Sequence, residues 1–173
     1  MMAMILYPPE HFDINEWFTL ISLAVIVTFA FLLPKRFSPV AITVYTVFTV
    51  FISQSVDSLI AVKPFDMYDV SDSSKYEVMD IVIYYLNYPP YTYIFLYFYD
   101  KWQLKGIVRI LYVGLFSGVS VFFEWLACLC HVFTFNGWKL WYSPFVYLVV
   151  FTLYIIVHHA TEKVLRGYAA RSH

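Results

Sequence analysis

Five long runs of apolar residues, separated by short polar segments, restrict what this chain can fold into more than any other feature of its sequence. A helix crosses the roughly 30 Å hydrocarbon layer of a membrane with about 20 residues, so each run is long enough for one crossing. Because backbone polar groups in lipid must bond internally, the runs predict helices, whereas a membrane barrel would need shorter, alternating segments. The expected spans are approximately residues 17–33, 39–62, 78–99, 107–133 and 140–159.

The composition supports a membrane location. Of the 173 residues, 61% are hydrophobic and 13% are charged, whereas roughly a quarter of the residues in a soluble domain are charged. We therefore expect an all-α fold, a polytopic transmembrane helix bundle of five spans that forms a single transmembrane domain over residues 1–173. The lipid bilayer is the first expected partner. No basic patch of useful size is present, so a nucleic-acid partner is not expected.

Basic residues are distributed unevenly over the segments between the spans. Eight of the eleven lie on one side of the expected membrane and three on the other. By the positive-inside rule the side with eight is cytoplasmic, so we expect the N-terminus outside and the C-terminus in the cytoplasm. No basic segment or small-residue cleavage site precedes the first run, so we expect it to stay as a span. The eight are Lys35, Arg36, Lys101, Lys105, Arg109, Lys163, Arg166 and Arg171, and the three are Lys63, Lys75 and Lys139.

Two acidic residues, Asp57 and Glu124, fall well inside expected spans, whereas Asp80 lies at the outer end of one. A charged side chain near the bilayer centre costs roughly 2.5–3.5 kcal/mol on insertion scales, so both should face protein or water rather than acyl chains. At roughly 1.5 Å per residue, Asp57 lies about 10 Å beyond the middle of its span, toward the outside. Glu124 lies similarly past the middle of the fourth span. Both are therefore expected in the outer half of the bundle.

Other polar residues recur at helical spacings of three and four around these acids, and they form one polar face on each of three spans. In lipid such faces can satisfy one another only by meeting, which predicts a polar cluster in the outer half of the bundle. The faces consist of Thr46, Ser53 and Asp57 with Gln54 beside them, of Asp80, Tyr84, Asn87 and Tyr91, and of Ser117, Ser120, Glu124, Cys128 and His131. The candidate ligand- or ion-binding residues are Asp57, Asp80, Asn87 and Glu124, with Gln54, Tyr84, Ser120 and His131 in support.

Two prolines, Pro89 and Pro90, fall in the middle of the third expected span. Proline has no backbone N–H, so the carbonyls of Tyr85 and Leu86 lose their helical donors and a kink is expected there. A broken helix in a membrane can hold a ligand or an ion at the break. The alternative is a kink that serves only packing, because proline is common in membrane helices.

The fourth span carries residues that could bind a metal. Glu124, Cys128 and His131 are spaced so that one helix face could present three ligands to a soft metal. No second cluster of Cys or His elsewhere completes a tetrahedral site, so neither a metal nor a cofactor is expected. On a helix the side chains of Cys128 and Cys130 point about 200° apart, so a disulfide between them is not expected.

Two further features concern the end of one helix and the outer face of another. His158 and His159 lie at the cytoplasmic end of the last expected span, where a cation suits the helix dipole and a solvated position is expected. Gly114 and Gly118 form a small-xxx-small pattern that lets another helix approach closely. That helix can belong to the same chain, to a homo-oligomer or to another membrane protein.

Two segments resemble a known family. The segment EWLACLCHVFTFNGWKLWYSPFVYLVVFTLYIIVHH contains Glu124 inside the fourth span and has Trp141 and Ser143 at the start of the fifth. The segment PPYTYIFLYFYDKW contains a Tyr-rich half-helix that follows Pro90 and ends in a basic loop. In these features the chain resembles an uncharacterised family of small five-pass integral membrane proteins from Gram-positive, spore-forming bacteria. The resemblance implies a multi-pass protein of the bacterial cell membrane, and it implies no activity, cofactor or substrate.

The sequence leaves three kinds of function open. The first is a polar cluster that binds a proton, a cation or a small polar solute, in transport or in sensing. The second is a non-catalytic scaffold or assembly subunit, whose acids lock helices together or pair with a basic group on a partner's span. A membrane-embedded enzyme is the least supported, because no nucleophile, base and electrophile occur at one depth. We therefore do not expect an enzyme.

Overall fold

The structure, a computed structural model, describes residues 7–9, 11–61, 64–70 and 77–171, and most of these residues are helical. The expected all-α class is confirmed. Two three-residue strands, which the apolar pattern did not indicate, form a small antiparallel ribbon. The elements are α1 (Ile14–Leu32), α2 (Pro39–Ile60), β1 (Tyr68–Val70), α3 (Val78–Ile81), the π-helical segment η1 (Val82–Asn87), α4 (Tyr88–Lys101), α5 (Gly106–Leu129), β2 (Phe133–Phe135), the 3₁₀ turn η2 (Leu140–Tyr142) and α6 (Ser143–Arg171).

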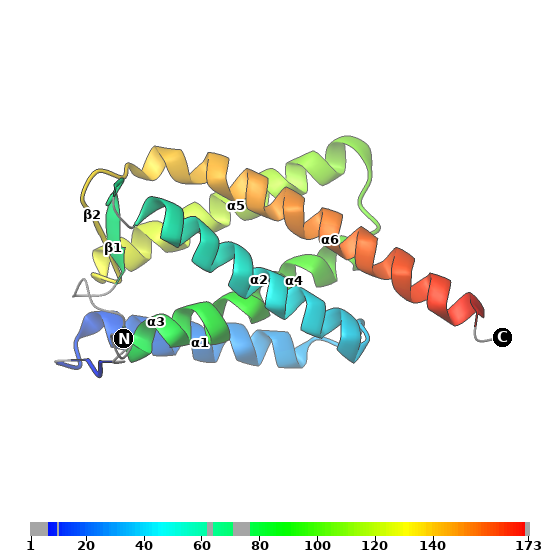
Figure 1. Cartoon of the computed structure of the whole chain (residues 1–173), viewed down its shortest axis with the longest axis horizontal. Helices are drawn as coiled ribbons and strands as arrows, with labels where there is room; N and C mark the ends of the chain where they lie inside the picture. The colour runs from blue at the N-terminus through cyan, green and yellow to red at the C-terminus, as the bar shows by residue number, and fades with distance from the viewer. Residues whose placement is uncertain (1–6, 10, 62–63, 71–76, 172–173) are drawn as a thin grey trace.

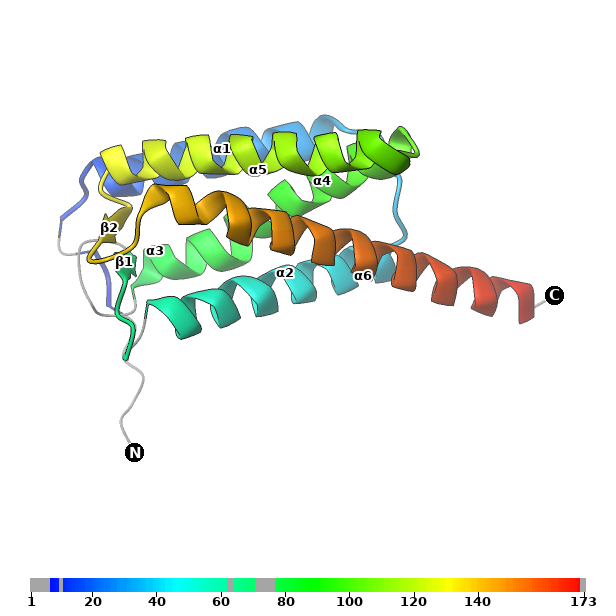
Figure 2. The same ribbon diagram turned by 90° about the horizontal axis from the view of Figure 1, so that it is seen from above.

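The long helices run side by side as a bundle (Figures 1 and 2). Helix α5 packs on α6, and α2 packs against both α4 and α6. The segments 33–38 and 102–105 and the C-terminal part of α6 lie toward one end, which we call the Arg36 end (Figure 1). The strands β1 and β2 and the start of α3 lie at the other end, which we call the ribbon end (Figure 1).

Among the described residues, four helical stretches are long and apolar enough to cross a membrane: α1, α2, α5 and the stretch 140–171 formed by η2 and α6. Large apolar side chains cover their outer surfaces, and Phe31 is 84% exposed. Such a surface is stable against lipid and costly against water. The fold therefore supports a membrane protein.

The third expected span is helical but is not one regular α-helix. Its α4 part has 14 residues, which is fewer than a crossing needs, and it follows η1 and α3 without a gap. Pro89 and Pro90 stand in the first turn of α4, directly after η1, where the Tyr88 N–H bonds to the Ile83 carbonyl five residues back. Because the two prolines remove donors, the turn before them widens to a π-helical pattern.

Local sequence signals explain where the helices begin. The Ser38 hydroxyl caps α2 by accepting a hydrogen bond from the Ala41 N–H (3.2 Å), and Pro39 occupies the first position of the helix. Helix α1 begins with a capping box in which the Glu16 carboxylate accepts a bond from the Asp13 N–H (2.7 Å). These caps satisfy backbone donors at the helix N-termini, which would otherwise lack partners.

The last two helices end at other residues than the expected spans do. Helix α5 ends at Leu129 rather than at residue 133, because the chain turns through His131 at a φ of 57° and enters β2. Helix α6 continues past residue 159 to Arg171, with Glu162 and Arg166 paired across one turn at 3.9 Å. Val62, at the end of the second expected span, and Lys63 and Lys75 lie outside the described residues.

The middle of the bundle is packed with aromatic rings around Phe95, which is fully buried. Its ring centroid lies 4.5 Å from that of Phe151, 5.1 Å from that of Phe116 and 5.2 Å from that of Tyr112. The Tyr112 hydroxyl also donates a hydrogen bond to the Phe95 carbonyl (2.7 Å). These contacts join α4, α5 and α6 at one point.

Replacing Phe95 with alanine should destabilise the bundle. Each close aromatic pair is worth roughly 0.5–1.5 kcal/mol, so the loss of three pairs should lower the free energy of unfolding by about 1.5–4.5 kcal/mol. Lipid solvates separated helices as well as folded ones, so the loss comes from packing rather than from exposure to water. Thermal unfolding in detergent measures it. Phe145→Ala on the outer face of α6, where the side chain is 64% exposed, is the matched control and should change little; equal losses would contradict this account.

Candidate functional site

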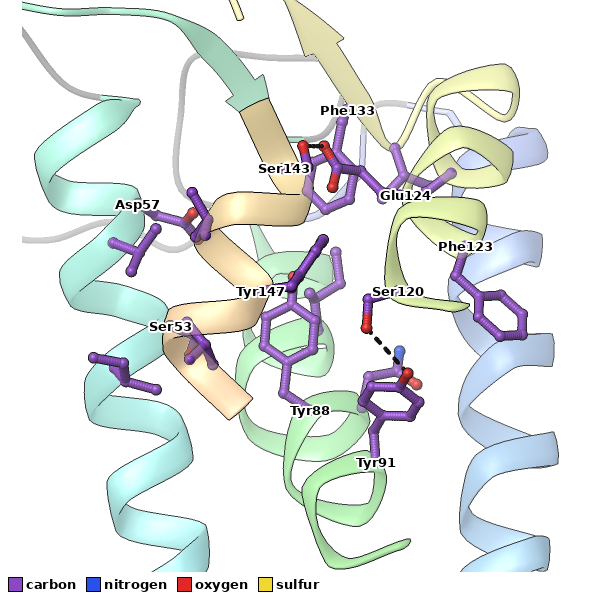
Figure 3. A pocket seen from close by; sticks show the side chains of 18 of the residues that line it. Ser53, Asp57, Tyr88, Tyr91, Ser120, Phe123, Glu124, Phe133, Ser143 and Tyr147 are labelled. Carbon is purple, nitrogen blue, oxygen red and sulfur yellow. Dashed lines mark hydrogen bonds between the residues drawn. The ribbon is translucent and has the colours of Figure 1, made fainter. Parts of the chain in front are cut away.

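A cavity of about 260 Å³ lies between the middle of the bundle and the ribbon end. Residues of α1, α2, η1, α4, α5 and α6 form its wall, and Tyr68 of β1 with Phe133 and Phe135 of β2 contributes at the ribbon end. Figure 3 shows side chains from separate helices pointing into this space. The cavity is therefore enclosed by elements that are far apart in the sequence.

Three of the four candidate binding residues line this one cavity: Asp57 of α2, Asn87 of η1 and Glu124 of α5. The fourth, Asp80, is not part of the wall. It stands in the first turn of α3, where its carboxylate accepts a hydrogen bond from the Glu77 N–H (2.7 Å) as part of a capping box. The structure thus gives Asp80 a place in starting a helix, apart from the cavity.

Glu124 lies among hydrogen-bond donors that carry no charge. The Ser143 hydroxyl donates to its Oε1 (2.6 Å), and the Trp138 indole N–H donates to the same Ser143 oxygen (2.9 Å). The Tyr147 hydroxyl lies within hydrogen-bonding reach of the same carboxyl group. Figure 3 shows Ser143 and Glu124 facing each other from α6 and α5. One carboxyl group therefore ties the start of α6 to α5.

Asp57 is held in a similar way from the ribbon side. The Tyr68 hydroxyl of β1 donates to its Oδ1, and the Tyr84 hydroxyl of η1 is within hydrogen-bonding reach. Burial, together with the nearby Asp57 carboxylate, raises the pKa of the Tyr68 hydroxyl well above its ordinary value, so Tyr68 stays protonated and remains a donor. The short ribbon thus forms part of the cavity wall and holds one of its acids.

Asn87 presents an acceptor that the protein leaves unused. Its side chain is 7% exposed, and its Nδ2 donates to the Thr19 carbonyl of α1 (3.3 Å). Its Oδ1 is buried and has no hydrogen-bond partner among the described residues. An unsatisfied buried acceptor costs roughly 1–3 kcal/mol. The Asn87 amide therefore joins η1 to α1 and leaves one buried acceptor unsatisfied.

The supporting residues divide between the cavity and its surroundings. Ser120 lines the cavity, and its hydroxyl pairs with that of Tyr91 (3.0 Å), as the dashed line in Figure 3 marks. Gln54 instead donates to the Tyr85 hydroxyl (3.2 Å) on an exposed side of the bundle. His131 is exposed at the end of α5 and is not part of the wall. Tyr84, Pro89 and Pro90 lie next to the wall without belonging to it.

The described wall combines two carboxyl groups with aromatic surface. Asp57 and Glu124 are its acidic residues, and they are close enough for their charges to interact. None of the described lining residues is Lys, Arg or His. The aromatic lining residues are Phe18, Tyr68, Tyr88, Tyr91, Phe123, Phe133, Phe135, Trp138, Tyr147, Phe151 and Tyr154. Such a wall attracts positive charge and accommodates apolar surface.

The three residues of the fourth span that could bind a metal are Glu124, Cys128 and His131. Within the part of the chain that the structure describes, no group of three His, Cys, Asp or Glu side chains could hold a metal ion. Cys128 and Cys130 are both free. Chemistry at this site therefore depends on carboxyl, hydroxyl, amide and aromatic groups.

The sequence analysis missed a second buried polar site at the Arg36 end. His158, expected at a solvated end, is 2% exposed, and its Nδ1 lies 2.8 Å from the Tyr45 hydroxyl of α2. Its Nε2 lies 3.4 Å from Asp100, whose other carboxylate oxygen accepts from the Arg36 Nε at 2.5 Å. One signal in the sequence could have indicated that α2 continues its polar positions toward this end. Tyr45 and Thr49 precede Asp57 at multiples of four residues along α2.

Ser143→Ala should loosen the cavity. The change removes the hydroxyl that donates to Glu124 and accepts from Trp138, so it should lower the free energy of unfolding by roughly 1–3 kcal/mol. Chemical unfolding of the purified protein measures this loss. Ser55→Ala is the matched control, because that hydroxyl bonds to the Phe51 carbonyl of its own helix (2.7 Å). If Ser143→Ala is no more destabilising than Ser55→Ala, the Glu124 contact does not stabilise the fold.

Comparisons with known proteins give no family to which the chain can be assigned: no family model, curated protein or solved structure matches it. The functional argument therefore depends on the chemistry of the cavity.

Proposed function

We propose that this chain is a multi-pass protein of the bacterial cell membrane that binds a small organic cation in the ribbon-end cavity, in transport or in sensing. Among the proton, the cation and the small polar solute considered from the sequence, an organic cation suits the wall best. The observation that carries this proposal is the position of Asp57, Asn87 and Glu124 in the wall of one aromatic cavity.

Size and lining support a ligand with an apolar body. The cavity of about 260 Å³ is far larger than a proton or a bare metal ion needs, since one water molecule occupies about 30 Å³ of liquid. Rings of Tyr and Trp attract a cation through their electron-rich faces and also cover apolar groups. Two carboxyl groups without a basic neighbour in the described wall favour a positive ligand over a neutral or negative one.

Five crossings with the Arg36 end in the cytoplasm are part of the same proposal. Residues 78–101, formed by α3, η1 and α4, are together long enough for a fifth crossing beside the four apolar stretches. Lys35, Arg36, Lys101 and Lys105 belong to loops and helix ends at the Arg36 end, which the positive-inside rule assigns to the cytoplasm. The resemblance to five-pass proteins of spore-forming bacteria agrees with this arrangement.

The second candidate function is a membrane scaffold or assembly subunit. It is favoured by Gly114 and Gly118, because a Cβ added at either position would meet no atom within 4 Å in this chain. These glycines are therefore open to a helix of another copy or of another membrane protein. The bonds of Glu124 and Asp57 to Ser143 and Tyr68 also suit a structural role. A scaffold does not require a cavity with an unpartnered acceptor, which is why we place it second.

Cysteine labelling tests the orientation. In a protein with Cys128 and Cys130 replaced by alanine, Lys139→Cys at the ribbon end should react on intact cells with a maleimide that cannot cross the membrane. Lys105→Cys at the Arg36 end should react only after the membrane is made permeable. Both positions are exposed, so lack of reaction reports on the membrane rather than on burial. The reverse pattern would invert the proposed orientation.

Equilibrium binding tests the ligand class, with benzyltrimethylammonium as the probe and the protein in lipid nanodiscs. Wild-type protein should bind this cation more tightly than the neutral aromatic alcohol 3-phenyl-1-propanol. Glu124→Gln and Asp57→Asn should each weaken binding about tenfold or more, because a contact to a charged group is worth roughly 1.5–3 kcal/mol. Isothermal titration calorimetry gives both affinities.

Glu162→Gln and Asp69→Asn are the matched controls, since neither residue lines the cavity, and both should bind the probe like wild type. Equal affinity for the cation and the alcohol would overturn the organic-cation proposal. A changed oligomer size in Glu124→Gln, with no binding of the cation by wild type, would support the scaffold instead.

A further inference from the structure

His158 is the centre of a hydrogen-bonded chain that runs across the Arg36 end of the bundle. Its two ring nitrogens face Tyr45 of α2 and Asp100 of α4, and Asp100 is in turn paired with Arg36. A carboxylate can only accept, so the Nε2 that faces Asp100 carries the imidazole proton. The bare Nδ1 therefore accepts a hydrogen bond from the Tyr45 hydroxyl. The donors therefore all point the same way, from Tyr45 through His158 to Asp100.

One end of this chain reaches water. The side chain of His158 is 2% exposed, whereas those of Asp100 and Arg36 are 20% and 34% exposed. Asp100 also accepts bonds at its backbone carbonyl from Arg36 (3.1 Å) and from Gln103 (2.6 Å), which fix the end of α4. A proton on Asp100 can therefore exchange with the aqueous phase at the Arg36 end.

The other end of the chain points toward the cavity along one face of α2. Tyr45, Thr49, Ser53 and Asp57 are spaced by four residues, which aligns them on that face. Thr49 is fully buried, and its Oγ1 has no hydrogen-bond partner among the described residues. The Tyr154 hydroxyl, which belongs to the cavity wall, lies next to Thr49. Thr49 thus stands one turn along α2 from Tyr45, toward Ser53 of the cavity wall, with the Tyr154 hydroxyl beside it.

We propose that Tyr45, His158 and Asp100 carry protons between the ribbon-end cavity and the aqueous phase at the Arg36 end, with the hydroxyls of Thr49 and Tyr154 on the cavity side of the path. A bundle held by packing alone has no need of polar side chains in this position, because each must be satisfied in a region that lipid surrounds. The proposal goes beyond ligand binding and does not depend on which solute the cavity holds.

One transfer step can be written with all protons accounted for. The Tyr45 hydroxyl proton passes to Nδ1 of His158, the Nε2 proton passes to the Asp100 carboxylate, and the Tyr45 oxygen takes a proton from the cavity side. Asp100 then releases its proton to water, so one proton enters, one leaves and no group changes its net charge. The imidazole is left with its proton on Nδ1. Reorientation of the ring brings this N–H to Asp100, and a second transfer, in which Nε2 takes the incoming proton and Nδ1 gives up its own, restores the starting tautomer.

The groups around His158 allow this exchange. Tyr45 faces it from α2, Asp100 and the ring of Tyr99 face it from α4, and Phe37 packs edge-on from the segment before α2. From α6 itself, His159 and Glu162 act on it through their charges, and Arg36 balances the charge of Asp100. A positive charge that forms briefly on the imidazole is thus placed beside one carboxylate and near another.

Proton movement into liposomes tests the proposal. Protein is reconstituted into vesicles that contain the pH dye pyranine, and a potassium diffusion potential drives protons inward, with and without benzyltrimethylammonium outside. Wild type should acidify the vesicles faster than protein-free liposomes do in at least one of the two conditions. Tyr45→Phe and His158→Gln should lower the rate by roughly a hundredfold or to the protein-free level, since a positioned proton-transfer group contributes about 10²–10⁴-fold.

The chain offers a matched control pair beside the path, on α4 and α6. The Tyr99 hydroxyl lies 2.9 Å from Nε2 of His159, so Tyr99→Phe and His159→Gln remove the same chemical groups beside the path. Both control variants should keep the wild-type rate. Size-exclusion chromatography confirms folding, and Tyr45→Phe keeps the ring that packs in the core if His158→Gln does not fold.

Three results would overturn the proton path: a wild-type rate equal to that of protein-free liposomes, a folded Tyr45→Phe protein with the wild-type rate, or equal losses in the control pair. The liposome assay tests the proton path, and the binding assay tests the organic-cation proposal, so either proposal can be overturned without the other. Proton movement without binding of the cation would remove only the organic-cation proposal. Binding of the cation without proton movement would remove only the path.

Discussion

Hydrogen bonds between polar side chains of different helices are the constraint on which this bundle depends. In lipid, separated apolar helices lose little by staying apart, so apolar contact alone does not select one arrangement. Polar groups in the same region have no partner outside the protein. The bond from Ser143 to Glu124 joins α6 to α5, that between Tyr45 and His158 joins α2 to α6, and that from Asn87 to the Thr19 carbonyl joins η1 to α1. Each bond fixes a pair of helices that packing would leave free to slide.

The break in the third helical stretch follows from the same requirement. Pro89 and Pro90 cannot donate, so the helix before them winds more widely, and Asn87 stands at the last position of the wide turn. From there the Asn87 side chain reaches α1 with its amide nitrogen and forms part of the cavity wall. A π-helical turn beside a cavity is a frequent arrangement at functional sites. Here two prolines therefore determine both the break and the position of a candidate binding group.

Particular residues show how much could be predicted. Helical spacing alone was enough to bring Asp57, Asn87 and Glu124 to one place, because an acid or amide in lipid must turn toward the interior and the turn of a helix fixes its neighbours. Asp80 obeyed the same spacing yet caps α3, since spacing does not tell where a helix begins. His158 was expected in water because the apolar run ends beside it.

Two further features depend on contacts between distant segments. The side chain of His158 points inward as α6 continues to Arg171, and the apolar pattern does not extend to that part of the helix. The ribbon of β1 and β2 pairs Tyr68 with Phe135 across a long stretch of sequence, and neither strand is long enough to show an alternating pattern. A single sequence carries no signal for such pairing, so the residues that close the cavity were not foreseen.

The cavity and the His158 site share the same two helices, α2 and α6. Tyr45 lies near the start of α2 and Asp57 near its end, while Ser143 begins α6 and His158 lies in its middle. A change in the angle between these helices would alter the Tyr45–His158 bond and the cavity wall together, because both helices behave as stiff rods over this length. A ligand shifts such an equilibrium only by the difference between its affinities for the two arrangements. The cation that we propose between Asp57 and Glu124 would contact α2 and α5, and the position of Glu124 depends on its bond to Ser143 of α6. On this proposal, a cation that binds one arrangement of α2 and α6 more tightly than another would also shift the Tyr45–His158 bond.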